Sequence, residues 1–289
     1  MRHFFLHPGR RLWLTGLLLA LAAAAGRAQF RPEEIARWSY WEDFLKTAEI
    51  VSAKPIGQGV TAPLKLLLRK GEVETSAAWK AVTGAPMGVL DEWRYEVAAF
   101  RMDKLLGLNM VPPCVEREYK GRAGALSFWA DNKYSLLDLQ EQGIAIPKES
   151  FDHTEKMKYI ARFWDSLIGN DDRTQENVRY TDDWRMILID HSRAFRAENI
   201  HKERLMFCQN GLKMRRVEDG SKVPMLFRTV PRALVEKVRG LTAAAVREAV
   251  GTYLTAGEIE AVIARRKLIL DEIAAMAKQF GEANVLYAP

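Results

Sequence analysis

Three polar residues in the middle of the chain have the types and the order that phosphoryl transfer requires. Asp172 and Asn177 are separated by four residues in a polar loop, and Asp190 ends the apolar strand predicted for residues 185–190. Phosphoryl transfer uses one carboxylate near the acceptor hydroxyl and two oxygen ligands for a divalent metal ion. Asp and Asn are common in loops, so this spacing gains meaning only from its context.

Residues upstream supply that context in the order that a nucleotide site needs. Gly57 and Gly59 lie in a predicted turn between two strands, and Lys80 lies in a third strand. Glu96 lies in the first turns of the next predicted helix. A glycine turn can cradle phosphates, a lysine can bind them, and a glutamate can pair with that lysine. Each feature alone has a structural explanation, but together and in this order they favour an ATP site.

These motifs resemble those of the atypical protein-kinase-like fold family, which includes the phosphatidylinositol 3- and 4-kinases, the HipA-type kinases and the four-jointed secretory-pathway kinases. Residues 169–173 (Gly-Asn-Asp-Asp-Arg) followed by Asn177, and residues 188–191 (Leu-Ile-Asp-His), are similar to the catalytic and metal-binding loops of that family. Residues 96–107 resemble its glutamate helix. The resemblance covers roughly residues 49–280.

The resemblance implies a role for each matching residue. Asp172 would orient or deprotonate the acceptor hydroxyl. Asn177 and Asp190 would hold the Mg²⁺ or Mn²⁺ ion that bridges the phosphates of ATP. Lys80 would bind the phosphates, and Glu96 would position Lys80.

Two positions depart from the family pattern. Many relatives have His directly after the Asp-Arg pair, whereas this chain has Thr174, which cannot carry a positive charge. Asp190 is followed by His-Ser-Arg rather than by Phe-Gly. His191 has two open interpretations, a proton shuttle or a side chain that caps the end of the strand. The departures leave open a pseudokinase that binds nucleotide or a partner without turnover.

Periodicity and turn residues predict an α+β protein, and the family resemblance implies a two-lobed protein-kinase-like fold. We expect a helical extension over residues 29–48, a β-rich N-terminal lobe over 49–131 and a helical C-terminal lobe over 132–289. The N-terminal lobe is expected to hold three strands within residues 50–82, a helix over 91–106 ended by Gly107, and strands over 111–119 and 123–130. The C-terminal lobe is expected to hold a helix through 157–168, a hairpin over 178–190, an irregular segment over 196–230, and a long helix from the capping box at 255–258 to Gly281. The extension is expected to form one amphipathic helix over 33–46.

The N-terminal residues predict a secretory signal peptide over residues 1–28. Arg2, Arg10 and Arg11 precede an apolar run of about 14 residues, and Gly26 and Ala28 are the small residues that a signal peptidase reads. A membrane-spanning helix needs about 20 apolar residues, so a permanent anchor is the weaker hypothesis and no stable span is expected after cleavage. An exported chain would be periplasmic or secreted, or lie in the secretory lumen of a eukaryote.

The charge of the chain argues against a nucleic-acid binder. The sequence has 43 Lys and Arg residues against 37 Asp and Glu, but four of the Arg residues lie in the leader, so 39 against 37 remain. Nucleic-acid binders neutralise phosphates with a clustered basic surface, and no long basic stripe is present. The two cysteines, Cys114 and Cys208, either form a disulfide or are separately buried, and the sequence leaves both open.

The function that these observations favour is an exported, metal-dependent ATP phosphotransferase acting on a hydroxyl. A protein acceptor is favoured over a lipid or sugar acceptor. The alternatives are the pseudokinase and a secreted scaffold that binds no nucleotide.

Overall fold

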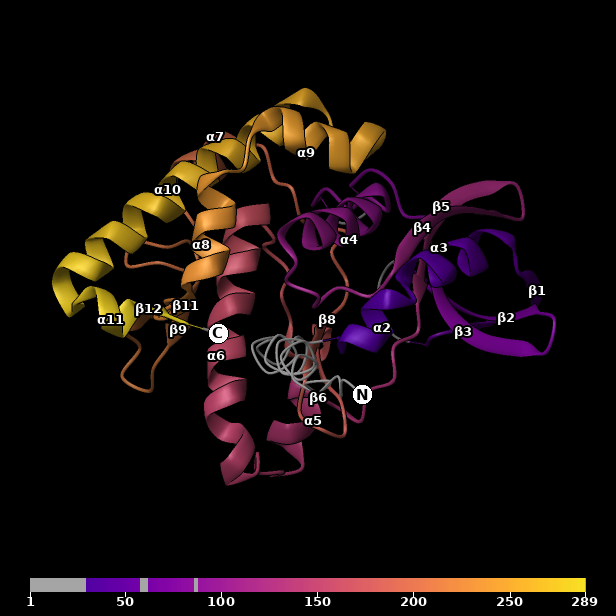
Figure 1. The fold of residues 1–289 in the computed structure, drawn as a ribbon, viewed down its shortest axis with the longest axis horizontal. Helices are drawn as coiled ribbons and strands as arrows, with labels where there is room; N and C mark the ends of the chain where they lie inside the picture. Colours follow the sequence, from indigo (N-terminus) through magenta and orange to yellow (C-terminus); the bar gives the residue numbers. More distant parts are fainter. Residues whose placement is uncertain (1–29, 58–61, 86–87, 289) are drawn as a thin grey trace, which may run out of the picture.

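The computed structural model describes residues 30–57, 62–85 and 88–288. The predicted signal peptide and Gly59 of the predicted glycine turn lie outside the described residues. The described chain forms a smaller β-rich lobe and a larger helical lobe, which lie side by side in Figure 1. The class is α+β, as predicted.

The N-terminal lobe is built on an antiparallel sheet with the strand order β1-β2-β3-β5-β4. The strands are β1 (Glu49–Pro55), β2 (Leu64–Lys70), β3 (Val73–Lys80), β4 (Cys114–Tyr119) and β5 (Arg122–Phe128). Lys120 and Gly121 join the last two strands with φ angles of 52° and 72°, the positive pair that a two-residue hairpin turn favours. In the neighbouring pair of strands, β3 and β5, Lys80 lies opposite Ala125.

Two helices cover opposite faces of this sheet. Side chains alternate along a strand, so neighbouring residues face opposite ways. Leu126 packs in a small core with residues of α3 (Trp38–Thr47), whereas Ala125 belongs to the main core with α4 (Arg94–Leu106). Helix α4 therefore shares its core with the helical lobe, and α3 shares its core with the sheet.

Two helix boundaries differ from the prediction. The N-terminal extension is two segments, α2 (Pro32–Ala36) and α3, because the Arg37 N–H bonds back to the Glu34 carbonyl in a tighter turn. Helix α4 begins at Arg94 rather than at residue 91, because Asp91 and Glu92 are held in contacts with other loops. Its predicted end is correct, since Gly107 adopts a left-handed φ of 65°.

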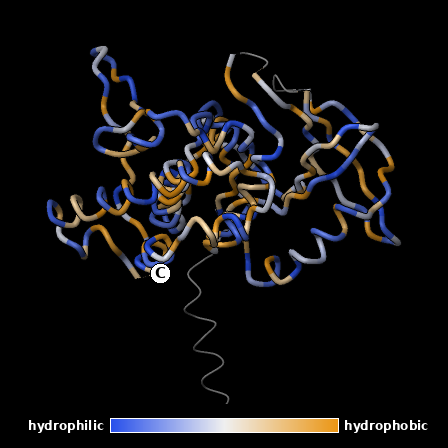
Figure 2. The backbone as a smooth tube through the Cα atoms, turned by 90° about the horizontal axis from the view of Figure 1, so that it is seen from above, coloured by the Kyte–Doolittle hydropathy of each residue, from blue (hydrophilic) through white to orange (hydrophobic). Residues whose placement is uncertain are grey.

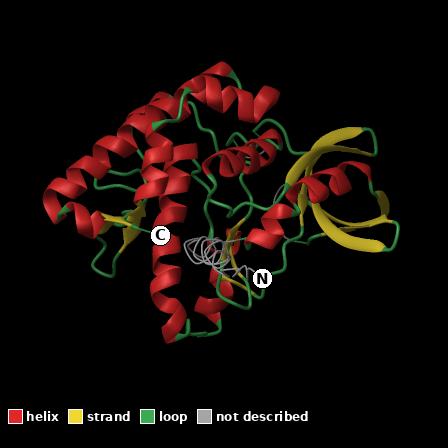
Figure 3. Ribbon diagram, viewed as in Figure 1, coloured by secondary structure: helices red, strands yellow, loops and turns green. Residues whose placement is uncertain are grey.

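The C-terminal lobe is organised around two long helices that pack against each other, α6 and α10 (Figure 3). Its helices are α5 (Leu136–Glu141), α6 (Lys148–Ile168), α7 (Asn199–Glu203), α8 (Arg232–Arg239), α9 (Ala243–Val250), α10 (Ala256–Phe280) and α11 (Glu282–Val285), with 3₁₀ turns at Gln175–Asn177 and Gly251–Tyr253. The predicted capping box opens α10, where Thr255 and Glu258 bond reciprocally. Figure 2 shows apolar segments concentrated where these helices meet.

Small sheets complete the C-terminal lobe. The predicted hairpin is present as β7 (Val178–Tyr180) and β8 (Met186–Leu188), and β6 (Tyr134–Ser135) adds a third strand. The segment predicted to be irregular contains α7 and a hairpin of β9 (Met214–Arg216) and β10 (Lys222–Pro224). Strand β11 (Val230–Pro231) pairs in parallel with β12 (Leu286–Tyr287).

The cysteines are not bridged. Cys114 and Cys208 are both buried and free, so the disulfide hypothesis is wrong. Cys114 lies in β4, where its sulfur accepts a hydrogen bond from Ser127, while Cys208 lies in the helical lobe. Across the ranges that the structure describes, no helix is both long and apolar enough to cross a membrane.

Candidate active site

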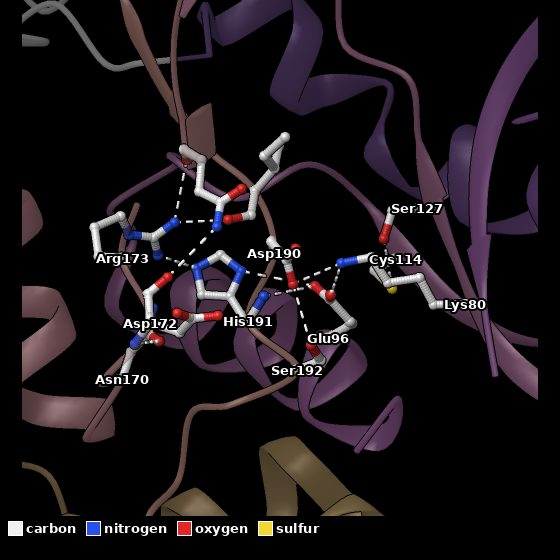
Figure 4. A network of polar contacts seen from close by, with 12 residues as sticks. Lys80, Glu96, Cys114, Ser127, Asn170, Asp172, Arg173, Asp190, His191 and Ser192 are labelled. Atoms are coloured by element: carbon white, nitrogen blue, oxygen red, sulfur yellow. Dashed lines mark hydrogen bonds and ion pairs between the residues drawn. The ribbon is translucent and has the colours of Figure 1, made fainter. Parts of the chain in front are cut away.

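Lys80 lies in a buried polar network between the two lobes, where it contacts two carboxylates (Figure 4). Its Nζ atom lies 2.8 Å from Oε1 of Glu96 in the first turn of α4 and 2.6 Å from Oδ1 of Asp190 after β8. The Lys80 and Glu96 side chains are 13% and 6% exposed, so this is an inward-facing pair rather than a surface lysine. The structure thus brings together three of the sequence-predicted site residues.

The charges of this pair stabilise each other. Burial alone lowers the pKa of Lys80, but the carboxylates of Asp190 and Glu96 outweigh burial and raise it. Burial alone raises the pKa of Glu96, but Lys80 and His191 together outweigh burial and lower it. Both side chains are therefore charged at neutral pH, as a phosphate-binding lysine requires.

Asp190 faces Lys80 because of its backbone conformation. Its φ angle is 61°, in the left-handed region that costs an L residue roughly 1 kcal/mol or more. The Ser192 hydroxyl donates to Oδ1 of Asp190 over 3.1 Å. The Asp190 side chain remains 37% exposed, so the carboxylate is still accessible to a ligand.

Buried side chains of the helical lobe hold the loop that carries Asp172. Gly169 ends α6 with a φ of 64°, and a Cβ at this position would lie 2.7 Å from the guanidinium carbon of buried Arg265. Asn170 is fully buried, and its amide donates to Asp165 while its carbonyl accepts the Asp172 N–H. The loop therefore projects the Asp172 side chain outward, where it is 40% exposed.

Arg173 ties this loop to the strand that leads to Asp190. Its guanidinium donates to both carboxylate oxygens of Asp165 over 3.0 Å. It also donates to the carbonyls of Asn177 and Ile189 over 3.1 and 2.6 Å. This bidentate pair is almost completely buried, with exposures of 7% and 1%, so it fixes the spacing of the two loops.

His191 bridges α4 and the loop that carries Asp172. Its Nε2 atom lies 2.9 Å from Nη2 of Arg173 and 3.3 Å from the indole nitrogen of Trp164. Both partners are donors, so Nε2 accepts and the proton is assigned to Nδ1, which faces Glu96 at 3.8 Å. Burial lowers the pKa of His191 despite Glu96. The ring is fully buried, which disfavours the proton-shuttle interpretation and fits a structural bridge.

Asp172 and Asn177 lie next to each other beside this network. The Asn177 amide nitrogen lies 3.4 Å from the Asp172 carbonyl oxygen. Partial burial raises the pKa of Asp172, and the nearby Asp190 adds to this although Arg193 opposes it. A carboxylate with a raised pKa is a stronger base than an ordinary surface aspartate.

A cavity of about 420 Å³ lies between the lobes, and Asp172 is not among the residues that line it. Its polar lining includes Lys80, Glu96, Asn177 and Asp190. Apolar walls come from Ile56, Phe128 and residues of β8. Its size falls in the range of small-molecule sites. Gly57 directly follows Ile56 and has a φ of 78°, a left-handed conformation that favours glycine, so the predicted turn begins at the edge of this cavity.

The donor atoms in this cavity fit a hard divalent cation. Asn177, whose side chain has an amide oxygen, and Asp190, a carboxylate, both line this cavity. Mg²⁺ and Mn²⁺ prefer such oxygen ligands, and Mg²⁺ takes only one or two from the protein.

Comparisons with known proteins bear on the fold. No protein-family model and no curated protein matches the sequence. A structure of hydra Fam20 with sugar is similar over 92% of this chain and 96% of that one, with a TM-score of 0.62 and 14% identity. The chain has the Fam20-type kinase fold. The predicted two-lobed kinase-like fold is confirmed.

Two structures of the Golgi casein kinase have the same fold. One is described with Mn and ADP bound, and both are 13% identical with a TM-score of 0.58. They match 88% of this chain and 79% and 78% of their own. At this identity the likeness to the Fam20-type kinases concerns the fold.

Sequence reasoning missed the residues that support the site. Asp165, Asn170 and Arg173 hold the loop that carries Asp172, and Arg193 pairs with both Asp172 and Asp91. Asp165 did carry a signal, because it lies beside Trp164 on the apolar face of a predicted helix. A charged residue there requires a buried partner.

Proposed function

We propose that the chain is a metal-dependent kinase that transfers the γ-phosphoryl group of ATP to a hydroxyl. The observation that carries the proposal is the pairing of Lys80 with both Glu96 and Asp190 in the lining of the cavity. A lysine held by a helix glutamate beside a metal-binding aspartate is the arrangement that positions phosphates in kinases.

Each residue of the site has a proposed task. Lys80 would bind the phosphates, with Glu96 holding its ammonium in place. Asn177 and Asp190 would hold Mg²⁺ or Mn²⁺, which neutralises charge on the phosphates when bound. The Golgi casein kinase structure with Mn and ADP supports this use of nucleotide and metal. The turn at Gly57 and Gly59 would cover the phosphates.

Asp172 would act at the acceptor. It would accept a hydrogen bond from the acceptor hydroxyl and orient its oxygen toward the γ-phosphorus. As the new P–O bond forms and the bond to the ADP oxygen breaks, the hydroxyl proton would pass to the Asp172 carboxylate. The raised pKa of Asp172 supports this task.

The acceptor is proposed to be a protein hydroxyl, with sugar and lipid hydroxyls as alternatives. The structurally similar casein kinase supports a protein acceptor, whereas the similar structure of hydra Fam20 with sugar supports a sugar acceptor. The predicted signal peptide supports action outside the cytoplasm, in the periplasm, the medium or a secretory lumen.

A pseudokinase is the second candidate. Thr174, which replaces the His of many relatives, is the observation that favours it. Such a protein would bind nucleotide or a partner through the same cavity and release no ADP.

The first experiment measures the melting temperature of the purified chain with and without ATP and Mg²⁺ or Mn²⁺. Ligand at 100 times its Kd adds about 2.7 kcal/mol, which for this size is a rise of roughly 5 to 10 °C. We expect the rise to require the metal and to disappear in Asp190→Asn. The control is Asp182→Asn, an exposed aspartate in the adjacent hairpin.

A second assay separates the two candidates. An active kinase forms ADP and a labelled acceptor when offered proteins, sugars and lipids, and Asp172→Asn stops both. A metal-dependent thermal shift with no ADP would favour the pseudokinase. No shift for the native chain would contradict both candidates.

A further inference from the structure

The two residues that follow Asp172 in the chain offer it no positive charge. Thr174, which follows the Asp172-Arg173 pair, is uncharged. The Arg173 guanidinium donates to both carboxylate oxygens of Asp165 in α6 rather than to Asp172. The γ-phosphoryl group is highly charged during transfer, and stabilising that charge is the main contribution of a kinase site. A cation at Asp172 therefore has to come from another segment.

Arg193 brings a cation to that position from the loop after Asp190. Its Nη1 atom lies 3.3 Å from Oδ2 of Asp172. Its Nε atom lies 3.1 Å from Oδ2 of Asp91, which precedes α4 and is 2% exposed. The guanidinium is thus held at one edge by a buried carboxylate and directed at Asp172 by the other edge.

The backbone around Arg193 is equally fixed. The Ser192 carbonyl accepts the Glu92 N–H over 2.8 Å, which joins this loop to the start of α4. The Ala194 N–H bonds to the His191 carbonyl over 2.9 Å, and Ala194 is fully buried. The Arg193 side chain keeps 20% of its surface exposed, so a ligand at Asp172 can reach it.

The remaining donors of this guanidinium suit a phosphoryl group. Arginine has five N–H donors in a planar fork that matches phosphate oxygens. The two described ion pairs use the Nε edge and one direction of Nη1. Burial lowers the pKa of Arg193, but Asp91 and Asp172 outweigh burial and raise it, so the group stays charged.

We infer that Arg193 is a catalytic residue that binds the transferring phosphoryl group, supplying in cis the charge that Thr174 lacks. The inference rests on the proposed kinase function. Asp91 is then a positioning residue, because it touches Arg193 and not the reacting atoms. Arginines in this role in other phosphotransferases are worth about 10³-fold or more in kcat.

The test compares Arg193→Met and Arg193→Lys with the native chain. The probes are Mg·ADP alone and Mg·ADP with aluminium fluoride, which mimics the phosphoryl group in transfer and is bound more tightly by a site complementary to that state. We expect Arg193→Met to keep the Kd for Mg·ADP within about twofold. It should lose at least tenfold of the extra affinity gained with aluminium fluoride, and Arg193→Lys should recover part of it.

Arg94→Met is the matched control, because this neighbouring arginine contacts Glu92 rather than Asp172. Arg193→Met leaves buried Asp91 without its partner, so the double variant Arg193→Met with Asp91→Asn is measured beside it. The double variant should show the same selective loss with a native melting temperature.

Three outcomes would overturn the inference. Equal aluminium fluoride affinity in native protein and Arg193→Met rejects the role of Arg193 and leaves the kinase proposal standing. A higher kcat in Arg193→Met would mean that Arg193 blocks Asp172 rather than assisting it. No binding of Mg·ADP by the native chain rejects the kinase proposal and the role of Arg193 together.

Discussion

At the scale of single residues, the proposed function assigns nucleotide binding and phosphoryl transfer to different side chains. Lys80, Glu96 and Asp190 form one charged network inside the cavity. Asp172 lies outside that network, on a loop that its neighbours hold rigid. A substitution at Asp172 is therefore expected to change transfer without changing nucleotide binding.

We predict that Asp172→Asn lowers kcat by about 10² to 10⁴-fold, the range for loss of a general base. The Kd for Mg·ADP should stay within about twofold, because the Lys80 network is untouched. Rate measurements and isothermal titration of both proteins check this. A weakened nucleotide affinity equal to the loss of rate would mean that Asp172 binds nucleotide instead.

At the scale of elements, buried polar ties hold the loops of the site to their helices. The Asp165–Arg173 pair joins α6 to the catalytic loop and to the end of β8. Asp103 in α4 joins that helix to the loop before β4, where its Oδ1 accepts the Met110 N–H over 3.0 Å. Met110 in turn accepts the Leu188 N–H of β8.

We predict that Asp165→Asn destabilises the fold by about 3 kcal/mol, because Arg173 keeps a buried charge without its carboxylate. Urea denaturation followed by circular dichroism measures the difference. The control is Asp152→Asn on the same helix, where the side chain is 81% exposed and an effect below about 0.5 kcal/mol is expected. Equal effects at both positions would contradict the proposed tie.

Asp103 should make stability depend on pH. Burial raises its pKa from 3.8 to about 7, despite backbone donors that include Met110. Between these values the folded state keeps a proton that the unfolded state has lost, so this group's contribution falls as pH rises from about 4 to 7. Asp103→Asn removes that dependence.

The measurement is the unfolding free energy of native protein and Asp103→Asn from pH 5 to pH 7. The difference should move in favour of the variant by about 1 kcal/mol per pH unit, since a fully coupled proton gives about 1.36. Other titrating groups cancel in this comparison. A difference that stays constant with pH would show that Asp103 is ionised in the fold.

At the scale of the whole molecule, the buried hydrophobic residues form one large core and one small core. The main core runs from α4 through α6 to α10, and the smaller core lies between α3 and the outer face of the sheet. The cavity that we propose for nucleotide lies where the sheet meets the main core. The Lys80–Glu96 pair therefore spans the two parts.

We predict that the amides of β1 and β2 exchange hydrogen through openings that need less free energy than those of α4 and α6. A difference of about 1.4 kcal/mol corresponds to a tenfold faster exchange. Hydrogen exchange with mass spectrometry checks this, and Mg·ATP should protect β3 and the loop after Asp190 most. Uniform exchange across both lobes would contradict a divided core.

Much of the fold could be predicted because its signals are local. Gly107, the Lys120-Gly121 turn and the capping box at Thr255 each fix a boundary through the conformation of a few neighbouring residues. The order of Lys80, Glu96, Asp172, Asn177 and Asp190 predicted one site. In the structure Lys80 pairs with Glu96 and Asp190, and Asn177 lies beside Asp172. The identities and sequence order of the candidate residues were thus determined by the sequence alone.

Contacts between distant segments were decided only by tertiary structure. Arg193 meets Asp91 across 102 positions, and His191 meets Glu96 across 95. Cys114 and Cys208 lie apart for the same reason, since packing of the lobes and not spacing in the chain sets their separation. Such contacts depend on how helices and sheets pack, and packing leaves no periodic pattern in the sequence near either partner. The sequence alone therefore determined which residues could do chemistry. The tertiary structure decided which of them come into contact.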